Sequence, residues 1–141
     1  MKLHLLRHAI AVPRGTPGTP DEKRPLTKEG IEKMNRAAPG LAGILGEPDL
    51  ILTSPLPRAL ETARIAARVL NAEHRVEKTD ALLPGRPPQD LYDALSKYSK
   101  ARNVLLVGHE PDLGRLASAL LGLKGGALPL KKGGLCRIDV D

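Results

Sequence analysis

The chain has 141 residues, a length that fits one domain of ordinary size. Its 22 Lys and Arg residues outnumber its 16 Asp and Glu residues, and the formal net charge of +6 admits nucleic acid, a membrane surface or a phosphorylated substrate as partner. Apolar residues make up 41% of the chain, as is typical of a globular protein, and two Tyr without any Phe or Trp disfavour recognition of single-stranded nucleic acid by stacked rings.

Strand and helix patterns alternate from the first residues onward. The apolar run 3–6 predicts a strand, and the Pro- and Gly-rich segment 12–25 predicts a long connection. Apolar residues at helical spacing then predict a helix over residues 27–45, with Thr27 as its N-cap. The pair Pro39-Gly40 should kink or break this helix.

The alternation continues to the end of the chain. Further strands are expected over residues 49–53, 75–78 and 104–107, and further helices over residues 57–70, 88–98 and 112–122. Residues 128–130 and 135–140, joined by a turn that contains Gly133 and Gly134, predict a terminal hairpin, and whether the last strand is complete stays open. This order predicts one α/β domain over residues 1–141: a three-layer α/β/α sandwich with a mostly parallel central sheet and a C-terminal hairpin.

Charged and imidazole side chains follow three of the expected strands. Arg7 and His8 come directly after the first strand. Arg58 lies in the first helical turn after the second strand, and His109 follows the strand at 104–107. Because ligands of an open α/β sheet bind beyond the carboxyl ends of its strands, we expect these side chains to meet at one edge.

These side-chain types fit phosphoryl transfer. Guanidinium groups bind phosphate oxygens in a bidentate way, and the helix N-terminus near Arg58 would add backbone N–H donors. A neutral imidazole is a competent nucleophile towards phosphorus, and a second imidazole could act in its protonated form as a donor to the phosphoryl oxygens. We therefore expect transfer through a phosphohistidine without a cofactor. The four histidines also lack the spacing of metal ligands, so no metal site is expected.

Three motifs resemble those of the histidine phosphatase superfamily, and the resemblance spans nearly the whole chain. The motifs are Leu6-Arg7-His8-Ala9, Thr53-Ser54-Pro55-Leu56-Pro57-Arg58-Ala59 with Glu61-Thr62-Ala63, and Gly108-His109-Glu110. A fourth pattern is most similar to the SixA-type phosphohistidine phosphatases, and it comprises Asp21, Arg24-Pro25-Leu26-Thr27 and Gly30. The resemblance implies a phosphoglycerate-mutase-like fold. It also implies His8 as the nucleophile, Arg7 and Arg58 as phosphoryl ligands, and His109 as a donor to the same oxygens.

The chain departs from the family pattern in two places. Ala9 stands where the family usually has Gly, which suggests that this residue does not need a positive φ. Larger members carry an acidic general acid shortly after the third strand, whereas this chain offers only Asp80 and, further on, Asp90 as candidates. A missing acid disfavours esters with poor leaving groups. It matters less for a phosphoramidate, whose imidazole can leave already protonated.

The connection between residues 9 and 26 is longer than most in compact domains, and it begins beside His8. We expect it to border the pocket and Arg24 to touch substrate. The short span between Asp80 and Val104 leaves no room for a large cap. An open pocket of this kind suits a phosphorylated protein side chain.

The sequence thus favours a phosphatase that acts on phosphohistidine in a protein. A broad small-molecule phosphomonoesterase or mutase, and a non-catalytic phosphate-binding module, stay open as alternatives. Neither nucleic acid nor membrane is expected as a partner, and the oligomeric state is open. The lone Cys136 cannot form an internal disulfide, and charged residues interrupt the N-terminus too early for a signal peptide, so we expect a cytoplasmic protein.

Overall fold

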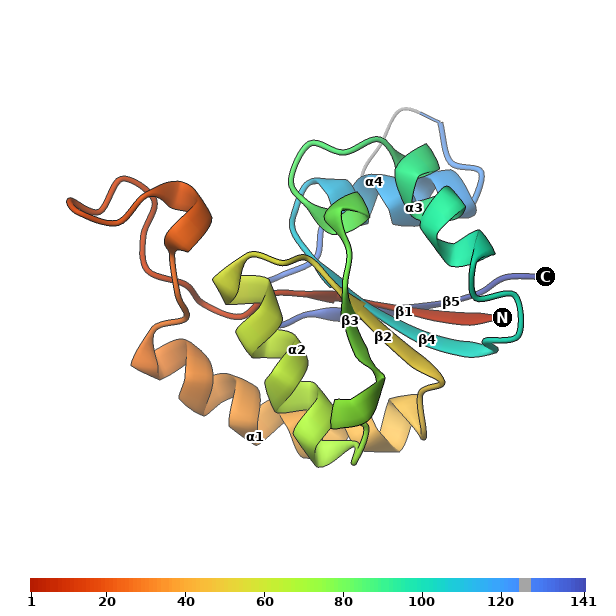
Figure 1. The fold of residues 1–141 in the computed structure, drawn as a ribbon, viewed down its shortest axis with the longest axis horizontal. Helices are drawn as coiled ribbons and strands as arrows, with labels where there is room; N and C mark the ends of the chain where they lie inside the picture. Colours follow the sequence, from red (N-terminus) through yellow and green to blue (C-terminus); the bar gives the residue numbers. More distant parts are fainter. Residues whose placement is uncertain (125–127) are drawn as a thin grey trace.

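A five-stranded sheet runs through the middle of the molecule (Figure 1). The computed structural model describes residues 1–124 and 128–141. In their order across the sheet the strands are β3 (Val76–Lys78), β2 (Leu50–Thr53), β4 (Asn103–Gly108), β1 (Lys2–Arg7) and β5 (Leu135–Asp139). The first four strands of the chain, β1 to β4, run parallel to one another, and β5 runs antiparallel to β1 at the edge of the sheet. The expected mostly parallel sheet is confirmed.

Helices cover both faces of this sheet (Figure 1). One face carries α1 (Lys28–Leu45) and α2 (Pro57–Val69), and the other carries α3 (Pro88–Ser96) and α4 (Asp112–Leu120). Because successive side chains of a strand point to opposite faces, Leu5 packs into the core under α3 and α4 while Leu6 packs into the core under α1 and α2. Both cores are built from aliphatic side chains, and the predicted three-layer α/β/α sandwich is confirmed.

The register of the parallel strands places the predicted site residues side by side. Arg7 at the end of β1 pairs with Gly108 at the end of β4, so His8 and His109 leave the sheet at adjacent points. Thr53 at the end of β2 pairs with Val107, which brings the turn before α2 to the same edge. The expectation that three strand ends deliver their side chains to one edge is therefore confirmed.

Helix α1 begins as predicted but is not interrupted. The Thr27 side chain accepts a hydrogen bond from the Gly30 backbone N–H at 2.9 Å, which confirms the N-cap. The expected break at Pro39-Gly40 is wrong, since the helix continues through Pro39 to Leu45. Pro39 lies on the exposed side of α1, where the carbonyl that loses its N–H partner can bond to water instead.

The predicted terminal hairpin is also wrong. Residues 128–130 form no strand, and β5 pairs with β1 instead of with a hairpin partner. The Leu130 backbone N–H donates to the Glu110 carboxylate at 3.3 Å, and its carbonyl accepts from Arg7 Nη1 at 2.9 Å. The chain does turn at residues 132–133, but the open edge of β1 offers β5 a longer ladder than residues 128–130 could.

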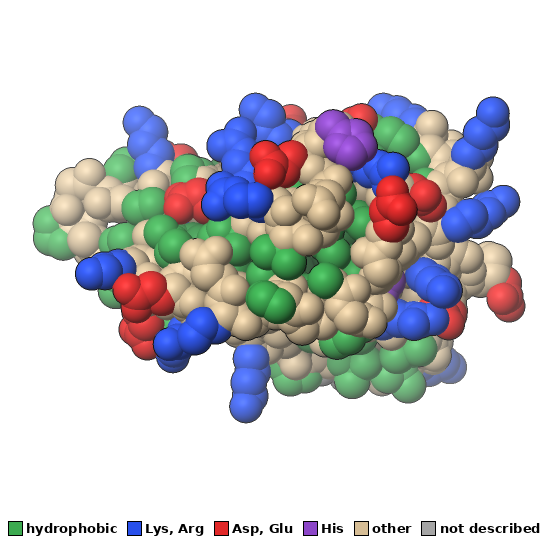
Figure 2. Space-filling view, turned by 90° about the horizontal axis from the view of Figure 1, so that it is seen from below, with side chains coloured by type: hydrophobic (Ala, Val, Ile, Leu, Met, Phe, Trp, Pro, Cys, Tyr) green, Lys and Arg blue, Asp and Glu red, His purple; other side chains and the backbone are tan. Residues whose placement is uncertain are grey.

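Charges of both signs share the surface. On the face seen in Figure 2, Lys and Arg side chains are interspersed with Asp and Glu. The excess of positive charge is therefore not gathered into a stripe on this face, as a nucleic-acid polymer would require. Within the described part of the chain, none of the helices has the length and apolar character needed to cross a membrane.

Candidate active site

A cavity of about 610 Å³ opens at the carboxyl ends of β1, β2 and β4. The five predicted site residues all line it: Arg7, His8, Arg24, Arg58 and His109. The remaining lining residues are Ile10, Ala11, Pro13, Arg14, Thr27, Glu29, Pro84, Glu110 and Lys132. Two imidazoles and several guanidinium groups thus share one concave space, and their contacts with a substrate stay predictions.

His8 is held at the floor of this cavity with one ring nitrogen engaged. Its Nδ1 lies 2.7 Å from the Ala9 carbonyl oxygen. A carbonyl can only accept, so Nδ1 carries the proton and Nε2 keeps its lone pair. Burial, with the charges of Arg58 and Arg7, lowers the pKa of His8 to about 4 against the opposing effect of the hydrogen bond to Ala9. The ring is therefore neutral at pH 7, as a nucleophile requires.

Arg58 comes from the first turn of α2, and its side chain is only 2% exposed. Its Nη1 donates to the Asp21 backbone carbonyl at 2.8 Å, and its Nη2 lies 3.7 Å from the Asp21 carboxylate. Thr62, one turn further along α2, donates to the Arg58 carbonyl at 2.7 Å and accepts from the Ala9 N–H at 3.0 Å. This hydroxyl links the two motifs, so the backbone after His8 and the start of α2 are fixed relative to each other.

The long connection after β1 borders the cavity, as predicted. Arg24 is 8% exposed; its Nε donates to the Asp21 carboxylate at 2.8 Å, and its Nη1 donates to the Val12 carbonyl at 2.9 Å. Arg14 reaches the same Asp21 oxygen at 3.1 Å. Burial opposes ionisation of Asp21, but the hydrogen bond and charge of Arg24, with the charges of Arg58 and Arg14, lower its pKa overall. Asp21 thus orients the guanidinium groups from inside the loop.

His109 is 4% exposed, and its Nε2 lies 2.8 Å from the Ser54 hydroxyl oxygen. Burial lowers its pKa to about 3, helped by the charges of Arg58 and of His8. In the free protein the ring of His109 is therefore neutral, because burial and the guanidinium charges disfavour its charged form. That the second imidazole acts in its protonated form on a bound phosphoryl group stays a prediction.

The segment before β5 supplies a residue that the sequence did not point to. The Gly133 N–H donates to the carbonyls of Arg7, at 3.1 Å, and His8, at 3.2 Å. These bonds lay the turn against the first motif and bring Lys132 into the cavity wall. Only the pairing of β5 with β1 produces this contact, so no local signal could have found it. The sequence also did not point to Glu29 as a site residue. It lines the cavity because it lies in the first turn of α1, beside the edge of the sheet.

Neither acid candidate lies in the cavity wall. Asp80 begins a short 3₁₀ helix (Asp80–Leu82), and Asp90 lies on α3, 3.4 Å from Arg86 Nη1. The carboxylates in the wall are those of Glu29 and Glu110, and one oxygen of Glu110 is engaged by the Leu130 N–H. Within the described residues, no three His, Cys, Asp or Glu side chains are grouped in a way that could hold a metal ion.

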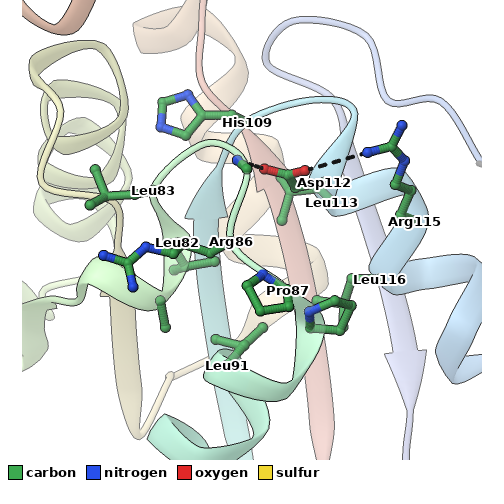
Figure 3. A pocket seen from close by; sticks show the side chains of 13 residues that line it. Leu82, Leu83, Arg86, Pro87, Leu91, His109, Asp112, Leu113, Arg115 and Leu116 are labelled. Atoms are coloured by element: carbon green, nitrogen blue, oxygen red, sulfur yellow. Dashed lines mark hydrogen bonds and ion pairs between the residues drawn. The ribbon is translucent and has the colours of Figure 1, made fainter.

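A second cavity, of about 250 Å³, shares His109 with the first, and Figure 3 shows the side chains that line it. Its wall is mainly aliphatic and is formed by Leu82, Leu83, Pro87, Leu91, Leu113 and Leu116. At its rim the Asp112 carboxylate accepts from the Gly85 N–H at 2.8 Å and lies 4.0 Å from Arg115 Nη1 (Figure 3). The irregular segment around Gly85 therefore shapes an apolar space next to the arginine-lined cavity.

Comparisons with known proteins agree with this geometry. Residues 3–82 match the profile of the histidine phosphatase superfamily (branch 1). An uncharacterized protein of Picosynechococcus is 35% identical over 142 residues, which cover 96% of this chain and 82% of that protein. A candidate phosphohistidine phosphatase SixA from Agrobacterium tumefaciens superposes with a TM-score of 0.82 at 26% identity, covering 98% of this chain and 90% of that one.

Two further solved structures share the fold. The protein histidine phosphatase SixA complexed with tungstate gives a TM-score of 0.85 at 25% identity, covering 100% of this chain and 89% of that one. A mycobacterial glucosyl-3-phosphoglycerate phosphatase gives 0.72 at 19% identity, covering 96% and 90%, a likeness of fold alone. The chain therefore belongs to the histidine phosphatase superfamily, as a phosphatase that resembles SixA.

Proposed function

We propose that the protein removes phosphoryl groups from phosphohistidine side chains of a protein, through a phosphohistidine intermediate on His8. The observation that carries this proposal is the state of the His8 ring. It is neutral, with Nδ1 held by the Ala9 carbonyl, and its Nε2 has no hydrogen-bond partner among the described residues of a cavity lined by arginines. A SixA structure that shares the fold is complexed with tungstate, a tetrahedral oxyanion like phosphate, and this supports a phosphatase role.

The first step forms a bond from His8 Nε2 to phosphorus and breaks the bond from phosphorus to the imidazole nitrogen of the substrate. Arg7 and Arg58 bind the phosphoryl oxygens and compensate the charge that spreads over them. The departing imidazole keeps the bonding electrons and leaves as neutral imidazole when its other ring nitrogen, the one not bonded to phosphorus, is already protonated. Water then attacks the phosphorus of phospho-His8 and the bond from phosphorus to Nε2 breaks. The bonding electrons return to Nε2, the protons of the water leave with the inorganic phosphate, and the neutral Nδ1–H ring is restored.

The positions of Asp80 and Asp90 support a phosphoramidate over an ester as substrate. These two candidates for protonating an alkoxide lie outside the cavity wall, whose carboxylates are those of Glu29 and Glu110. A phosphohistidine depends less on such a group, because its imidazole can be protonated beforehand at the ring nitrogen that is not bonded to phosphorus. The open rim, formed partly by Arg14 and Lys132, would also admit a side chain that projects from a protein surface.

One observation favours a second candidate function, hydrolysis of small phosphate monoesters. The apolar cavity beside His109 could hold a hydrophobic leaving group while the phosphoryl group occupies the arginine-lined space. Glucosyl-3-phosphoglycerate phosphatase, which shares the fold, acts on a small phosphorylated metabolite according to its name.

A labelling experiment tests the proposal. The protein is incubated with a ³²P-phosphohistidine protein, and we expect acid-labile, base-stable label on His8. His8→Ala should carry none, whereas replacing the exposed His74 in a matched His74→Ala variant should leave the label in place. Absence of label in the unsubstituted protein, or turnover of an alkyl phosphate ester as fast as phosphohistidine, would overturn it.

The lone cysteine is compatible with the cytoplasmic location that we also propose, which cell fractionation would test.

A further inference from the structure

We propose that the Ser54 hydroxyl selects the tautomer of His109, so that a neutral ring presents Nδ1–H to the phosphoryl group. Ser54 is then a positioning residue that acts through His109. The inference deepens the proposed function and rests on it for the identity of the acceptor, but the state of the ring can be measured independently.

Ser54 is fixed on every side before it reaches His109. It is fully buried, at the point where β2 ends and the turn to α2 begins. Its N–H donates to the Val107 carbonyl at 3.0 Å, and its own carbonyl accepts from the Thr53 hydroxyl at 3.0 Å. Its Oγ accepts from the Leu56 N–H at 3.2 Å and lies 2.8 Å from His109 Nε2. A movement of the hydroxyl oxygen would therefore break its hydrogen bond with the N–H of Leu56, the N-cap residue of α2.

Counting protons at this hydroxyl decides the direction of the bond to His109. A serine hydroxyl has one hydrogen to donate and can accept two. Among the described residues, the hydroxyl hydrogen of Ser54 has one acceptor within hydrogen-bond distance, and that acceptor is His109 Nε2. If Nε2 carried the ring proton instead, the Ser54 hydrogen would be buried without an acceptor. We infer that Ser54 donates and that the proton of His109 is on Nδ1.

The other ring nitrogen of His109, Nδ1, is a hydrogen-bond donor that an anionic ligand could satisfy. Nδ1 of His109 is buried and has no hydrogen-bond partner among residues 1–124 and 128–141. The ring itself lines the cavity that also holds His8 and Arg58. A buried donor without a partner is unfavourable unless a ligand satisfies it. A phosphoryl oxygen bound in the cavity would be the acceptor for this N–H.

This arrangement explains how His109 can act while its ring stays neutral. A protonated ring would donate from both nitrogens but would add a charge beside Arg58. In the neutral Nδ1–H tautomer the ring donates one hydrogen bond to the phosphoryl group without adding that charge. The Ser54 hydroxyl supplies the compensating hydrogen bond at Nε2, so both ring nitrogens are engaged once the phosphoryl group is bound.

Long-range ¹H–¹⁵N NMR spectra of protein labelled with ¹⁵N-histidine test the inference directly, because protonated and unprotonated ring nitrogens have different shifts. In the unsubstituted protein at pH 7 we expect His109 with Nδ1 protonated and Nε2 bare. In Ser54→Ala the Nε2–H tautomer should become the larger population, and in Ser54→Thr, which keeps the hydroxyl, the original tautomer should persist. Ser118→Ala removes a hydroxyl that is also buried but lies on α4, and it should leave the spectrum unchanged.

Kinetics give a second readout. Ser54→Ala should lower kcat for phosphohistidine hydrolysis on the order of tenfold, and Ser54→Thr should restore most of it. An Nε2–H tautomer of His109 in the unsubstituted protein would overturn the proposal even if no variant folds. An unchanged tautomer in folded Ser54→Ala would overturn it as well. If the tautomers behave as expected but no phosphohistidine is hydrolysed, the proposed function fails while the assignment of Ser54 and His109 stands.

Discussion

The imidazole rings of His8 and His109 lie with their centroids 5.3 Å apart and their planes tilted by 57°. Both rings are buried, and in both burial is the main cause of a pKa well below the ordinary value for histidine. The charges of Arg58 and Arg24 lower both values further. The positive charge of this cavity therefore comes from its arginines and Lys132 and not from the imidazoles, and the complement of the whole set is a phosphoryl dianion.

The lowered pKa values make stability depend on pH in a defined direction. The pKa of His8 falls from 6.5 to about 4 on folding, and that of His109 falls from 6.5 to about 3. Below pH 6.5 the unfolded chain binds more protons at these positions than the folded chain, so the free energy of unfolding should fall as the pH drops from 6.5 towards 4. Denaturant unfolding at a series of pH values measures this. His8→Gln should flatten the dependence, and replacement of the exposed His74 by Gln should not.

Replacement of Arg58 by Lys should impair catalysis more than stability. Lysine keeps the charge but loses the planar fork that can bond to two phosphoryl oxygens while it bonds to the Asp21 carbonyl. We expect kcat/KM to fall on the order of 100-fold, the scale of losing one oriented donor in a buried site. Arg64→Lys, on the exposed side of the same helix, is the matched control. Equal kcat/KM values for the two variants would contradict the assignment.

Arg24 should act mainly on substrate binding. Its guanidinium lines the cavity, yet two of its nitrogens are occupied by Asp21 and Val12, which leaves it fewer free donors for a phosphoryl group than Arg58. Arg24→Ala should therefore raise KM about tenfold and change kcat less, as expected for loss of a single charged hydrogen bond. Lys23→Ala removes a neighbouring exposed charge and should leave both constants unchanged. A change confined to kcat would show that Arg24 acts in the chemical step instead.

Gly30 lets helix α1 approach the segment after His8. A Cβ at this position would overlap the Ile10 carbonyl oxygen, which also accepts from the Thr27 N–H at 3.0 Å. Gly30→Ala should therefore destabilise the protein by about 1–3 kcal/mol, because backbone rather than a flexible side chain has to move. On the same helix, Gly43 has open space around it, and Gly43→Ala should raise stability by up to about 1 kcal/mol. Thermal unfolding of the two variants checks both signs.

The start of helix α1 and the edge of the sheet where the site lies could be predicted from residues close together in the sequence. Thr27 caps α1 because its hydroxyl reaches the N–H of Gly30, three residues later, whatever the rest of the chain does. Arg7, His8 and His109 share an edge because buried parallel strands place their carboxyl ends together. Spacing along the chain is enough for inferences of this kind, since hydrogen bonds within a turn and the direction of a strand depend on near neighbours.

Other features depended on partners distant in sequence. Pro39 is tolerated within α1 because its side of the helix faces solvent. The strand β5 pairs with β1, and not with residues 128–130, because β1 has an open edge. The neutral state of His109 needs both its burial and the nearby arginine charge, which no spacing reveals.

The sequence by itself thus determined which side chains meet at the sheet edge: Arg7, His8, Arg58 and His109. Only the tertiary structure decided their protonation, the bond from Ser54 to His109 and the absence of Asp80 from the cavity wall formed by the described residues. The physical reason is that pKa values and tautomers are set by desolvation and by contacts across the fold, whereas the identity and direction of a strand end are set along the chain.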